Sequence, residues 1–402
     1  MNYSAIIIAE NGRKTNSGKP KAMWELLGEP LIGWVLDSLK GVGIEESRVG
    51  IVFGGNEGSL TDYVSSRGNY RAFDNIGSAA DALLADSGNV LAMSCDTPFV
   101  NCDTLAAALN VHTHSGSDVT AIDTAAYWFR SEALAQRVSG GIRAAAADIA
   151  ANGGKLGTFG VSDPNITLAV NSRADLLRLN ITAKMAVIGK WLDEGVEFVS
   201  TDGVIIEKDV KIGRDTKILP GTILRGNTVI GENCVLGPNT LIENCKIGNG
   251  VILNSVQAYE SRIYDRVKAG PFVQLRPGTI LREGVKIGDF VEIKNSEIGV
   301  NTAVAHLTYL GDSDVGKGVN FGCGCVTANY DGISKFRTKI GDNAFIGCNT
   351  NLIAPVEIGD NAATGAGSTI TKDVPPDSLA VERADTRIIE HWEKNSKRIK
   401  KA

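Results

Sequence analysis

Aromatic residues and long apolar runs are scarce in this sequence of 402 residues. Phe, Trp and Tyr together make up 6% of the chain, and no apolar run approaches the roughly 18 residues that a membrane-spanning helix requires. The first residues, MNYSAIIIAENG, lack the basic segment and the long apolar core of a signal peptide. We therefore expect no membrane span and no secretion, and the sequence predicts a cytoplasmic protein.

Paired cysteines and a strong charge imbalance are also absent from the sequence. The seven cysteines include no Cys-x-x-Cys pair, so we expect free thiols in a reducing compartment instead of a disulfide framework. The net charge of −5 argues against a general nucleic-acid-binding protein, although it leaves room for a local basic pocket that binds a phosphate. Glycine, with 46 residues, is abundant and favours a fold with many tight turns and small repeated coils.

Short apolar runs alternate with helical patterns in the first part of the chain. The runs that read as buried strands are Ala5–Ala9, Val49–Phe53 and Val90–Met93, and Leu31–Leu39 reads as a helix. Strands that alternate with helices predict a parallel α/β sheet. Ligands of such sheets bind at the carboxyl ends of the strands, so the loops after Ala9 and Met93 are candidate binding loops. Further along, His112 and His114 read as exposed loop residues.

From about residue 201, aliphatic residues recur at six-residue steps. A first series comprises Ile206, Ile212, Ile218, Leu224, Ile230, Leu236 and Ile242, and a second comprises Ile340, Ile346, Leu352, Ile358 and Ile370, with Thr364 as its polar member. Three hexapeptides make one triangular coil whose aliphatic side chains point inward and whose corners take Gly or Asn. The repeat therefore predicts a left-handed parallel β-helix. An ordinary β-sandwich is the alternative, but a six-residue spacing that holds for seven aliphatic residues in succession disfavours it.

A helical pattern with an apolar stripe precedes the repeat, over residues 172–195, and we interpret it as a connecting arm. A basic stretch at the end of the chain either caps the coil or is a solvated tail. The predicted boundaries are 1–171 for the α/β domain, 172–198 for the linker helix, 199–385 for the β-helix and 386–402 for the tail.

The repeat loses its phase near residues 328–338, which predicts a loop outside the coil that can serve as a ligand arm. Arg276, Lys294 and Lys335 lie near this break and together could hold a phosphate, Arg through a bidentate fork and Lys through point charges. His306 can accept a proton near neutral pH, as acetyl transfer to an amine requires. A lone His is usually structural and surface cations are usually solvated, so the co-occurrence of these residues favours a site.

Residues 172–392 closely resemble the C-terminal half of the bacterial bifunctional N-acetylglucosamine-1-phosphate uridyltransferase / glucosamine-1-phosphate acetyltransferase family. The motifs that carry the resemblance are LRPG from residue 275, FVEIK from 290, AHLTYLGD from 305 and NYDGISK from 329. The resemblance implies acetyl-CoA-dependent N-acetylation of glucosamine 1-phosphate, toward UDP-N-acetylglucosamine, by a homotrimer with active sites between neighbouring prisms. Another amino-sugar 1-phosphate, such as galactosamine 1-phosphate, and a non-catalytic trimeric scaffold are the alternatives.

The same resemblance implies a role for each matching residue. His306 would be the general base on the sugar amine, supported by Glu292. The sugar-phosphate residues would be Arg276, Lys294, Tyr309, Asn320 and Lys335, and the acetyl-CoA residues would be Cys323, Asn329, Tyr330, Cys348, Ala366 and Arg383. Cys323 and Cys348 stand where the family usually has Ala and Ser. A nucleophilic cysteine is conceivable, but small residues at coil corners are the better interpretation.

The family's first domain is a Rossmann-like nucleotidyltransferase, and fragments of its motifs are found in residues 1–171. By position, the nucleotide-binding residues would be Gly12, Lys14, Lys21, Gly77 and Ser78, and Mg²⁺ would be held by Asp96 and Asn171 with waters and substrate phosphates. Glu10 replaces the first glycine of the family's phosphate loop and would repel a triphosphate, and the segment from Asp96 to Asn171 is shorter than the family norm. We therefore expect the fold to be kept, with weak, altered or no uridyltransferase activity on UTP.

Overall fold

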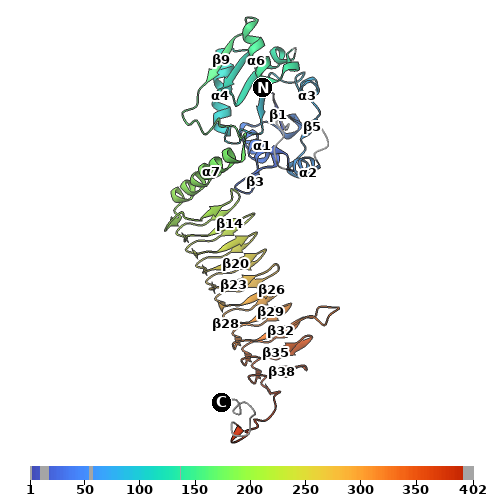
Figure 1. Ribbon diagram of the computed structural model, residues 1–402, viewed down its shortest axis with the longest axis vertical. Coiled ribbons are helices and arrows are strands. Elements are labelled where there is room, and N and C mark those ends of the chain that lie inside the picture. The colour runs from blue at the N-terminus through green and yellow to red at the C-terminus, as the bar shows by residue number, and fades with distance from the viewer. Residues whose placement is uncertain (1, 10–17, 54–57, 136, 393–402) are drawn as a thin grey trace, which may run out of the picture. The chain divides into compact units, whose positions relative to one another are not determined.

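The computed structural model describes residues 2–9, 18–53, 58–135 and 137–392 of the chain (Figure 1). The chain divides into two compact units, residues 1–188 and 189–402. Within the described ranges, no helix is long and apolar enough to cross a membrane. Each unit has its own hydrophobic core.

A seven-stranded sheet forms the centre of the first unit. Its strands are β1 (Tyr3–Ile8), β4 (Val49–Val52), β5 (Arg71–Phe73), β6 (Asn89–Ser94), β7 (Val119–Ile122), β8 (Ala126–Arg130) and β9 (Leu156–Phe159), in the order β5-β4-β1-β6-β8-β7-β9. The three strands expected from the sequence are confirmed as β1, β4 and β6. The expectation of a parallel sheet is wrong at one strand, because β8 runs antiparallel to both β6 and β7. A short turn with Asp123 in the left-handed region folds β7 back onto β8 as a hairpin.

Helices cover both faces of this sheet. They are α1 (Leu31–Val42), α2 (Gly58–Arg67), α3 (Ile76–Leu83), α4 (Cys102–Ser115), α5 (Ser131–Leu134) and α6 (Ile142–Ala151), with 3-10 turns at Lys21–Met23, Glu46–Arg48 and Val138–Gly140 and a small hairpin of β2 (Glu25–Leu26) and β3 (Glu29–Pro30). Ile7 packs in a core with α1, α2 and α4, whereas Ile6 packs in a second core with α3 and α6. Burial on both faces is typical of a Rossmann-like domain and confirms the predicted fold class.

The long helix α7 (Arg173–Asp193) contains the boundary between the two units. Its first half belongs to the first unit, where Leu176, Leu179 and Ala183 join a core that includes Trp24. Its last turn belongs to the second unit, where Trp191 is buried.

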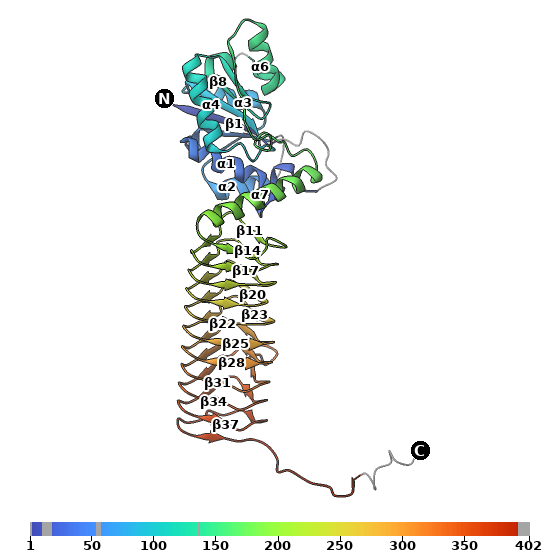
Figure 2. The same ribbon diagram turned by 90° about the vertical axis from the view of Figure 1, so that its left-hand side faces the viewer.

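Three parallel sheets form the faces of a triangular prism in the second unit (Figure 2). The first sheet contains β10 (Glu197–Phe198), β13 (Lys217–Ile218), β16 (Val235–Leu236), β19 (Ile252–Leu253), β22 (Lys268–Ala269), β25 (Lys286–Asp289), β28 (Ala303–His306), β31 (Asn320–Phe321), β34 (Phe345–Ile346), β37 (Ala363–Thr364) and β39 (Leu379–Ala380). The second sheet contains β11 (Ile205–Ile206), β14 (Ile223–Arg225), β17 (Leu241–Glu243), β20 (Val256–Tyr259), β23 (Val273–Leu275), β26 (Glu292–Lys294), β29 (Tyr309–Gly311), β32 (Val326–Ala328), β35 (Asn351–Ile353) and β38 (Thr369–Ile370). The third sheet contains β12 (Lys211–Ile212), β15 (Val229–Ile230), β18 (Lys246–Ile247), β21 (Arg262–Ile263), β24 (Ile280–Leu281), β27 (Glu297–Ile298), β30 (Ser313–Val315), β33 (Thr338–Ile340) and β36 (Val356–Ile358).

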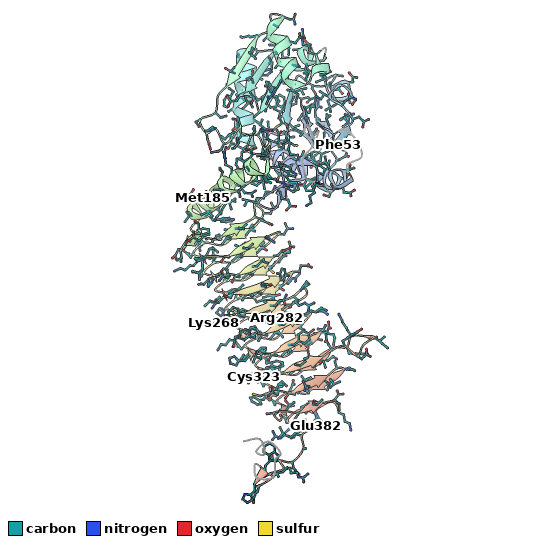
Figure 3. All side chains as sticks on the ribbon, in the orientation of Figure 1. Phe53, Met185, Lys268, Arg282, Cys323 and Glu382 are labelled. Carbon is teal, nitrogen blue, oxygen red and sulfur yellow. The ribbon has the colours of Figure 1, made fainter. Side chains whose placement is uncertain are left out.

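The repeated aliphatic side chains point into the prism, and every member of both series is buried, Ile212 being the most exposed at 7%. This confirms the left-handed parallel β-helix. Between the two series the step is sometimes five residues, as from Ile242 to Ile247 and from Ile293 to Ile298, and these short steps hide the repeat from a six-residue count. Outward side chains surround every coil, and Cys323 marks the corner that follows β31 (Figure 3).

Candidate functional site

His306 is the last residue of β28 and lies beside Asp289, the last residue of the neighbouring strand β25. Their Cα atoms are register partners, and His306 Nδ1 is hydrogen-bonded to Asp289 Oδ1. This hydrogen bond from the imidazole holds the pKa of the Asp289 carboxyl below its usual value. The His306 side chain is 57% exposed, so it is open to a ligand while one ring nitrogen is engaged.

Within one chain, Glu292 lies on a different sheet from His306, the base that it is expected to support. Glu292 lies on β26 in the second sheet, where its register partners are Gln274 and Tyr309. Its Oε1 pairs with Arg276 Nη1 at 2.7 Å, so this carboxylate orients the guanidinium. The carboxylate partner of His306 is Asp289, which the motif comparison alone did not single out.

Arg276, Lys294 and Lys335 are brought together at the corner that follows the second sheet. Lys335, then Arg276, crowd Lys294 with positive charge and lower the pKa of its ammonium group, and Asp312 opposes them. A phosphate site requires several cationic side chains close together. This arrangement agrees with the phosphate-binding role expected for these three residues.

The predicted loop outside the coil is confirmed between β32 and β33, and it projects from the prism in Figure 1. Asn329 begins the loop as a buried residue whose Nδ2 donates to Asp312 Oδ2 at 2.5 Å. Tyr330 pairs with Lys335 across the loop and donates its hydroxyl hydrogen to Gly332 O at 2.6 Å. The loop is therefore internally bonded and carries Lys335 in a defined position.

Four of the residues expected to contact acetyl-CoA, Cys323, Cys348, Ala366 and Arg383, form a column along one edge of the prism, whereas Asn329 and Tyr330 lie on the projecting loop. Each backbone carbonyl in the column accepts a hydrogen bond from the next coil. The bonds run from Gly324 N to His306 O (3.3 Å), Asn349 N to Cys323 O (2.7 Å), Gly367 N to Cys348 O (2.8 Å) and Arg383 Nη1 to Ala366 O (2.9 Å). The column starts at the exposed imidazole and ends at a guanidinium, so it offers an extended ligand a polar track.

The three cysteines near this column differ in exposure. Cys348 is exposed, Cys323 is half-buried, and Cys325 is buried. Burial raises the pKa of the Cys325 thiol to about 11, and the neighbouring Cys348 and Cys323 add to the shift. Cys325 is therefore a neutral packing residue at physiological pH, which supports the corner-residue interpretation for this thiol.

Tyr309 and Asn320 are not brought together within one chain. Tyr309 lies on β29 in the second sheet, next to Glu292 in register, whereas Asn320 is exposed on β31 in the first sheet. A ligand can contact both residues only if they come from two copies of the prism, or if the ligand extends around a corner.

In the first unit, Asp96 and Asn171 line one cavity of about 470 Å³ at the carboxyl end of β6. Lys21 Nζ forms an ion pair with Asp96 Oδ2 at 2.6 Å, with both side chains largely buried. Thr124 and Arg143 also line the cavity, and Arg143 donates to Thr124 O at 3.2 Å. Sequence reasoning missed these two residues, for which the glycine pair before α6 was the only local signal.

The other expected nucleotide residues are placed differently. Gly77 and Ser78 lie in the first turn of α3, where Asn75 caps the helix by accepting from Ser78 N at 2.9 Å. Gly12 and Lys14 lie outside the described residues. Among the residues that are described, no group of three or more His, Cys, Asp or Glu side chains is arranged to hold a metal ion. The oxygens of Asp96 and Asn171 suit Mg²⁺ chemically, but they need further oxygen ligands from water or a substrate.

The position of His112 differs from the sequence prediction. His112 and His114 lie on helix α4, not in an exposed loop, and His112 is buried. Its ring nitrogens are hydrogen-bonded to Thr120 Oγ1 (2.9 Å) and Asn89 Oδ1 (3.2 Å). His112 is thus a core residue that holds α4 against the sheet.

Comparisons with known proteins agree with both folds. Residues 5–155 match the MobA-like NTP transferase domain family, and residues 209–244 and 337–372 match the bacterial transferase hexapeptide (six repeats) family. The bifunctional protein GlmU of Thermosipho africanus is 36% identical over 438 residues, which cover 96% of each chain. The bifunctional protein GlmU of Acetivibrio thermocellus is 34% identical over 447 residues, covering 97% of this chain and 96% of the relative. That of Clostridium perfringens is 51% identical over 237 residues, covering 59% of this chain and 52% of the relative.

Proposed function

The chain belongs to the family of bifunctional GlmU proteins, and from this premise we propose that its β-helix N-acetylates glucosamine 1-phosphate with acetyl-CoA. The observation that carries the proposal is the exposed imidazole of His306, engaged by Asp289 and placed at the head of the backbone column. A base, a cation cluster and a track for an extended cosubstrate are the three elements that acetyl transfer to an amino-sugar phosphate needs.

The chemistry assigned to these residues is direct transfer. Asp289 accepts the Nδ1 hydrogen of His306, which leaves Nε2 free to take a proton from the sugar amine. That proton comes from the ammonium form of the amine, so a neutral nitrogen attacks the thioester carbonyl. As the C–N bond forms and the C–S bond breaks, the nitrogen loses its second proton, which passes to the CoA thiolate. Arg276, Lys294 and Lys335 hold the sugar phosphate during this step. No acyl-enzyme is needed, so no cysteine is given a nucleophilic role.

The base and the cations lie at different corners of the prism, which supports a site shared between copies. His306 lies at the corner before the second sheet, and the cation cluster lies at the corner after it. A strand of the second sheet therefore separates the imidazole from the cation cluster within one chain. We therefore propose a homotrimer in which the His306 corner of one prism faces the cation corner of another.

The first unit is proposed to bind a nucleotide in the cavity lined by Asp96 and Asn171. Mg²⁺ held by these two oxygens and by substrate phosphates would offset the phosphate charge. Lys21 forms an ion pair with Asp96, and we propose that its ammonium group binds the same phosphates. Because Glu10 replaces a glycine of the family's phosphate loop, we propose a uridyltransferase activity that is weaker than the acetyltransferase activity.

A split assay on the full chain tests both proposals. Glucosamine 1-phosphate with acetyl-CoA should release free thiol, and His306→Ala should lower that rate by about 10²–10⁴-fold with the fold intact. N-acetylglucosamine 1-phosphate with UTP and Mg²⁺ reports pyrophosphate separately. Thiol release only with galactosamine 1-phosphate would identify that sugar as the substrate. No release with either sugar would favour a non-catalytic trimeric scaffold.

A further inference from the structure

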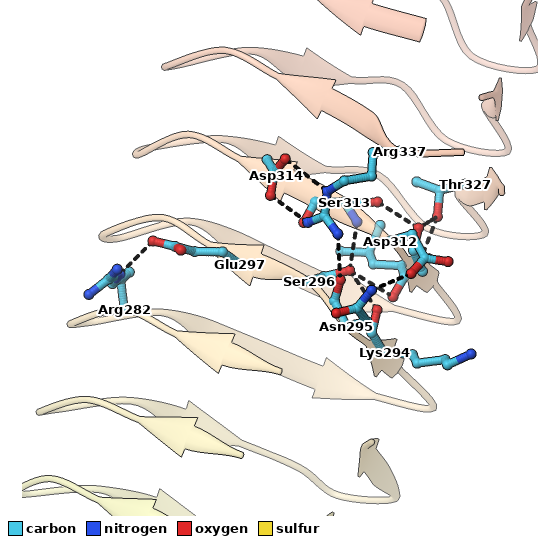
Figure 4. Close-up of polar contacts among 12 residues, drawn as sticks. Arg282, Lys294, Asn295, Ser296, Glu297, Asp312, Ser313, Asp314, Thr327 and Arg337 are labelled. Carbon is cyan, nitrogen blue, oxygen red and sulfur yellow. Dashed lines mark hydrogen bonds and ion pairs between the residues drawn. The ribbon is translucent and has the colours of Figure 1, made fainter. Parts of the chain in front are cut away.

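Asp312 is a buried carboxylate that none of the roles above uses. It follows β29 at a corner of the coil, with φ of 50°. Its Oδ1 accepts from Asn295 Nδ2 and its Oδ2 accepts from Asn329 Nδ2, each at 2.5 Å. Figure 4 shows this carboxylate between the Asn295 corner and the strand that carries Thr327. Asp312 therefore joins the coil before it to the first residue of the projecting loop.

The backbone of Asp312 ties the same elements together. Its N–H donates to Lys294 O at 3.0 Å, and its carbonyl accepts from Thr338 N at 3.1 Å, just after the loop rejoins the prism. Asp312 thus contacts the strand end that carries Lys294 and both ends of the loop that carries Lys335.

The charges around Asp312 are those of the phosphate site. Burial raises the pKa of the Asp312 carboxyl, but the hydrogen bonds from Asn295 and Asn329 and the charges of Lys294 and Lys335 outweigh it and hold the pKa below its usual value. Glu292, the other acid of the cluster, is already committed to Arg276. Asp312 is accordingly the acid whose charge attracts the two lysines.

We propose that Asp312 is a positioning residue for the phosphate of the sugar substrate. It joins the strand end that carries Lys294 to both ends of the loop that carries Lys335, and its charge balances the two ammonium groups at that corner. The inference rests on the proposed function and adds to it a residue that touches neither substrate. A carboxylate beside an anion site usually repels the anion. Here both oxygens are occupied by amide donors and the side chain is buried, so the two lysines, and not the acid, face the ligand.

The chain provides a matched control at the other end of the loop. Asp314 pairs with Arg337 through two bonds, Arg337 Nε to Oδ2 at 3.0 Å and Arg337 Nη2 to Oδ1 at 2.5 Å. Asp314→Asn weakens the attachment of the loop but leaves the Asp312 carboxylate in place. Asp312→Asn removes that acid, and asparagine tolerates the left-handed conformation of the corner, so the coil is kept.

Steady-state acetylation by the full chain separates the two variants. Asp312→Asn should raise the KM for glucosamine 1-phosphate about tenfold, since a hydrogen-bonded charge is lost, and should change the KM for acetyl-CoA less than twofold. Titration calorimetry with inorganic phosphate should show a similar loss of affinity. Asp314→Asn should leave phosphate affinity within about twofold of the wild type.

An unchanged KM in Asp312→Asn, an equal rise for both substrates, or the same rise in Asp314→Asn would overturn the proposal. The phosphate titration keeps this test separate from the proposed reaction. A wild-type chain that binds phosphate but releases no thiol would refute the acetylation, while the comparison of the two variants would still decide the role of Asp312.

Discussion

Asp289 and His306 end neighbouring strands of one sheet, and a hydrogen bond joins the Asp289 carboxylate to His306 Nδ1. The bond depends on the register of two adjacent coils, in which the two residues are 17 positions apart. A ring held at Nδ1 presents Nε2 outward, so the geometry of the prism fixes which nitrogen can act as a base.

Replacing the carboxylate tests this orientation. Asp289→Asn should lower kcat for acetyl transfer about tenfold or more, a part of the ~10²–10⁴-fold that general-base catalysis contributes, with little change in either KM. Stopped assays of thiol release at saturating substrate give the measurement. Glu297→Gln is the matched control, because Glu297 pairs with Arg282 on the third sheet. Equal kcat in the wild type and Asp289→Asn would remove Asp289 from the mechanism.

A site shared between copies makes two inactive variants complementary. His306→Ala and Lys294→Ala should each lose acetylation alone, but chains of both kinds refolded or expressed together should regain part of it, since some corners then carry both intact residues. The measurement is thiol release from the mixture against each variant at the same total concentration. Sedimentation velocity on the same samples reports the assembly. A mixture no more active than the separate variants would place the site within one chain.

Thiol reactivity should follow burial along the column. Iodoacetamide at pH 7.5 should modify exposed Cys348 well before Cys325, because burial raises the pKa of Cys325 to about 11 and keeps it protonated. Saturating acetyl-CoA should slow the labelling of Cys348 if the cosubstrate covers the column. Peptide mass spectrometry resolves the sites, and Cys348→Ser identifies the assigned peptide. Labelling of Cys348 at one rate with and without acetyl-CoA would argue against its place in the site.

The first unit should lose stability in mild acid. Burial, with the nearby Arg130 charge, lowers the pKa of His112 to about 4, whereas the unfolded chain has an ordinary value near 6.5. The unfolded state therefore binds the proton more tightly than the folded state. Neutral His112 contributes up to roughly 3 kcal/mol to the free energy of unfolding above pH 6.5, and this contribution is lost as the pH falls toward 4. Urea unfolding followed by tryptophan fluorescence at pH 7.5 and 5 measures it. His112→Gln should flatten this slope; an unchanged slope would assign it to other groups.

Repetition decided how much of the fold could be predicted. A six-residue step over Ile206 to Ile242 indicates inward side chains directly, and all of these residues are buried. The reversal of β8 was not predictable in this way, because an antiparallel strand buried on both faces has the same apolar character as a parallel one. His112 was misplaced for a related reason: its partners Thr120 and Asn89 come from two separate strands.

The candidate site also contains residues that could be predicted from the sequence and residues that could not. Arg276, Lys294 and Lys335 could be proposed from the sequence because charged side chains stand out beside a break in a repeat. Asp289 and Asp312 could not, because their roles depend on which residues adjacent coils place side by side, and five-residue steps shift that register without a visible mark. Coil length, and not residue type, would have been the signal.

Each strand of the prism pairs only with the strands on either side of it in its sheet, so resistance to opening is not uniform along the axis. The last strand, β39, has a single neighbour in β37, and Arg383 follows it on the exposed side. His306 lies several coils inward, with bonded strands on both sides. We therefore expect fraying to reach the coil beside Arg383, where we propose that the far end of acetyl-CoA binds, before it reaches the coil of His306. If acetyl-CoA binds along this column, its end beside Arg383 can exchange through local opening while His306 and Asp289 stay rigid.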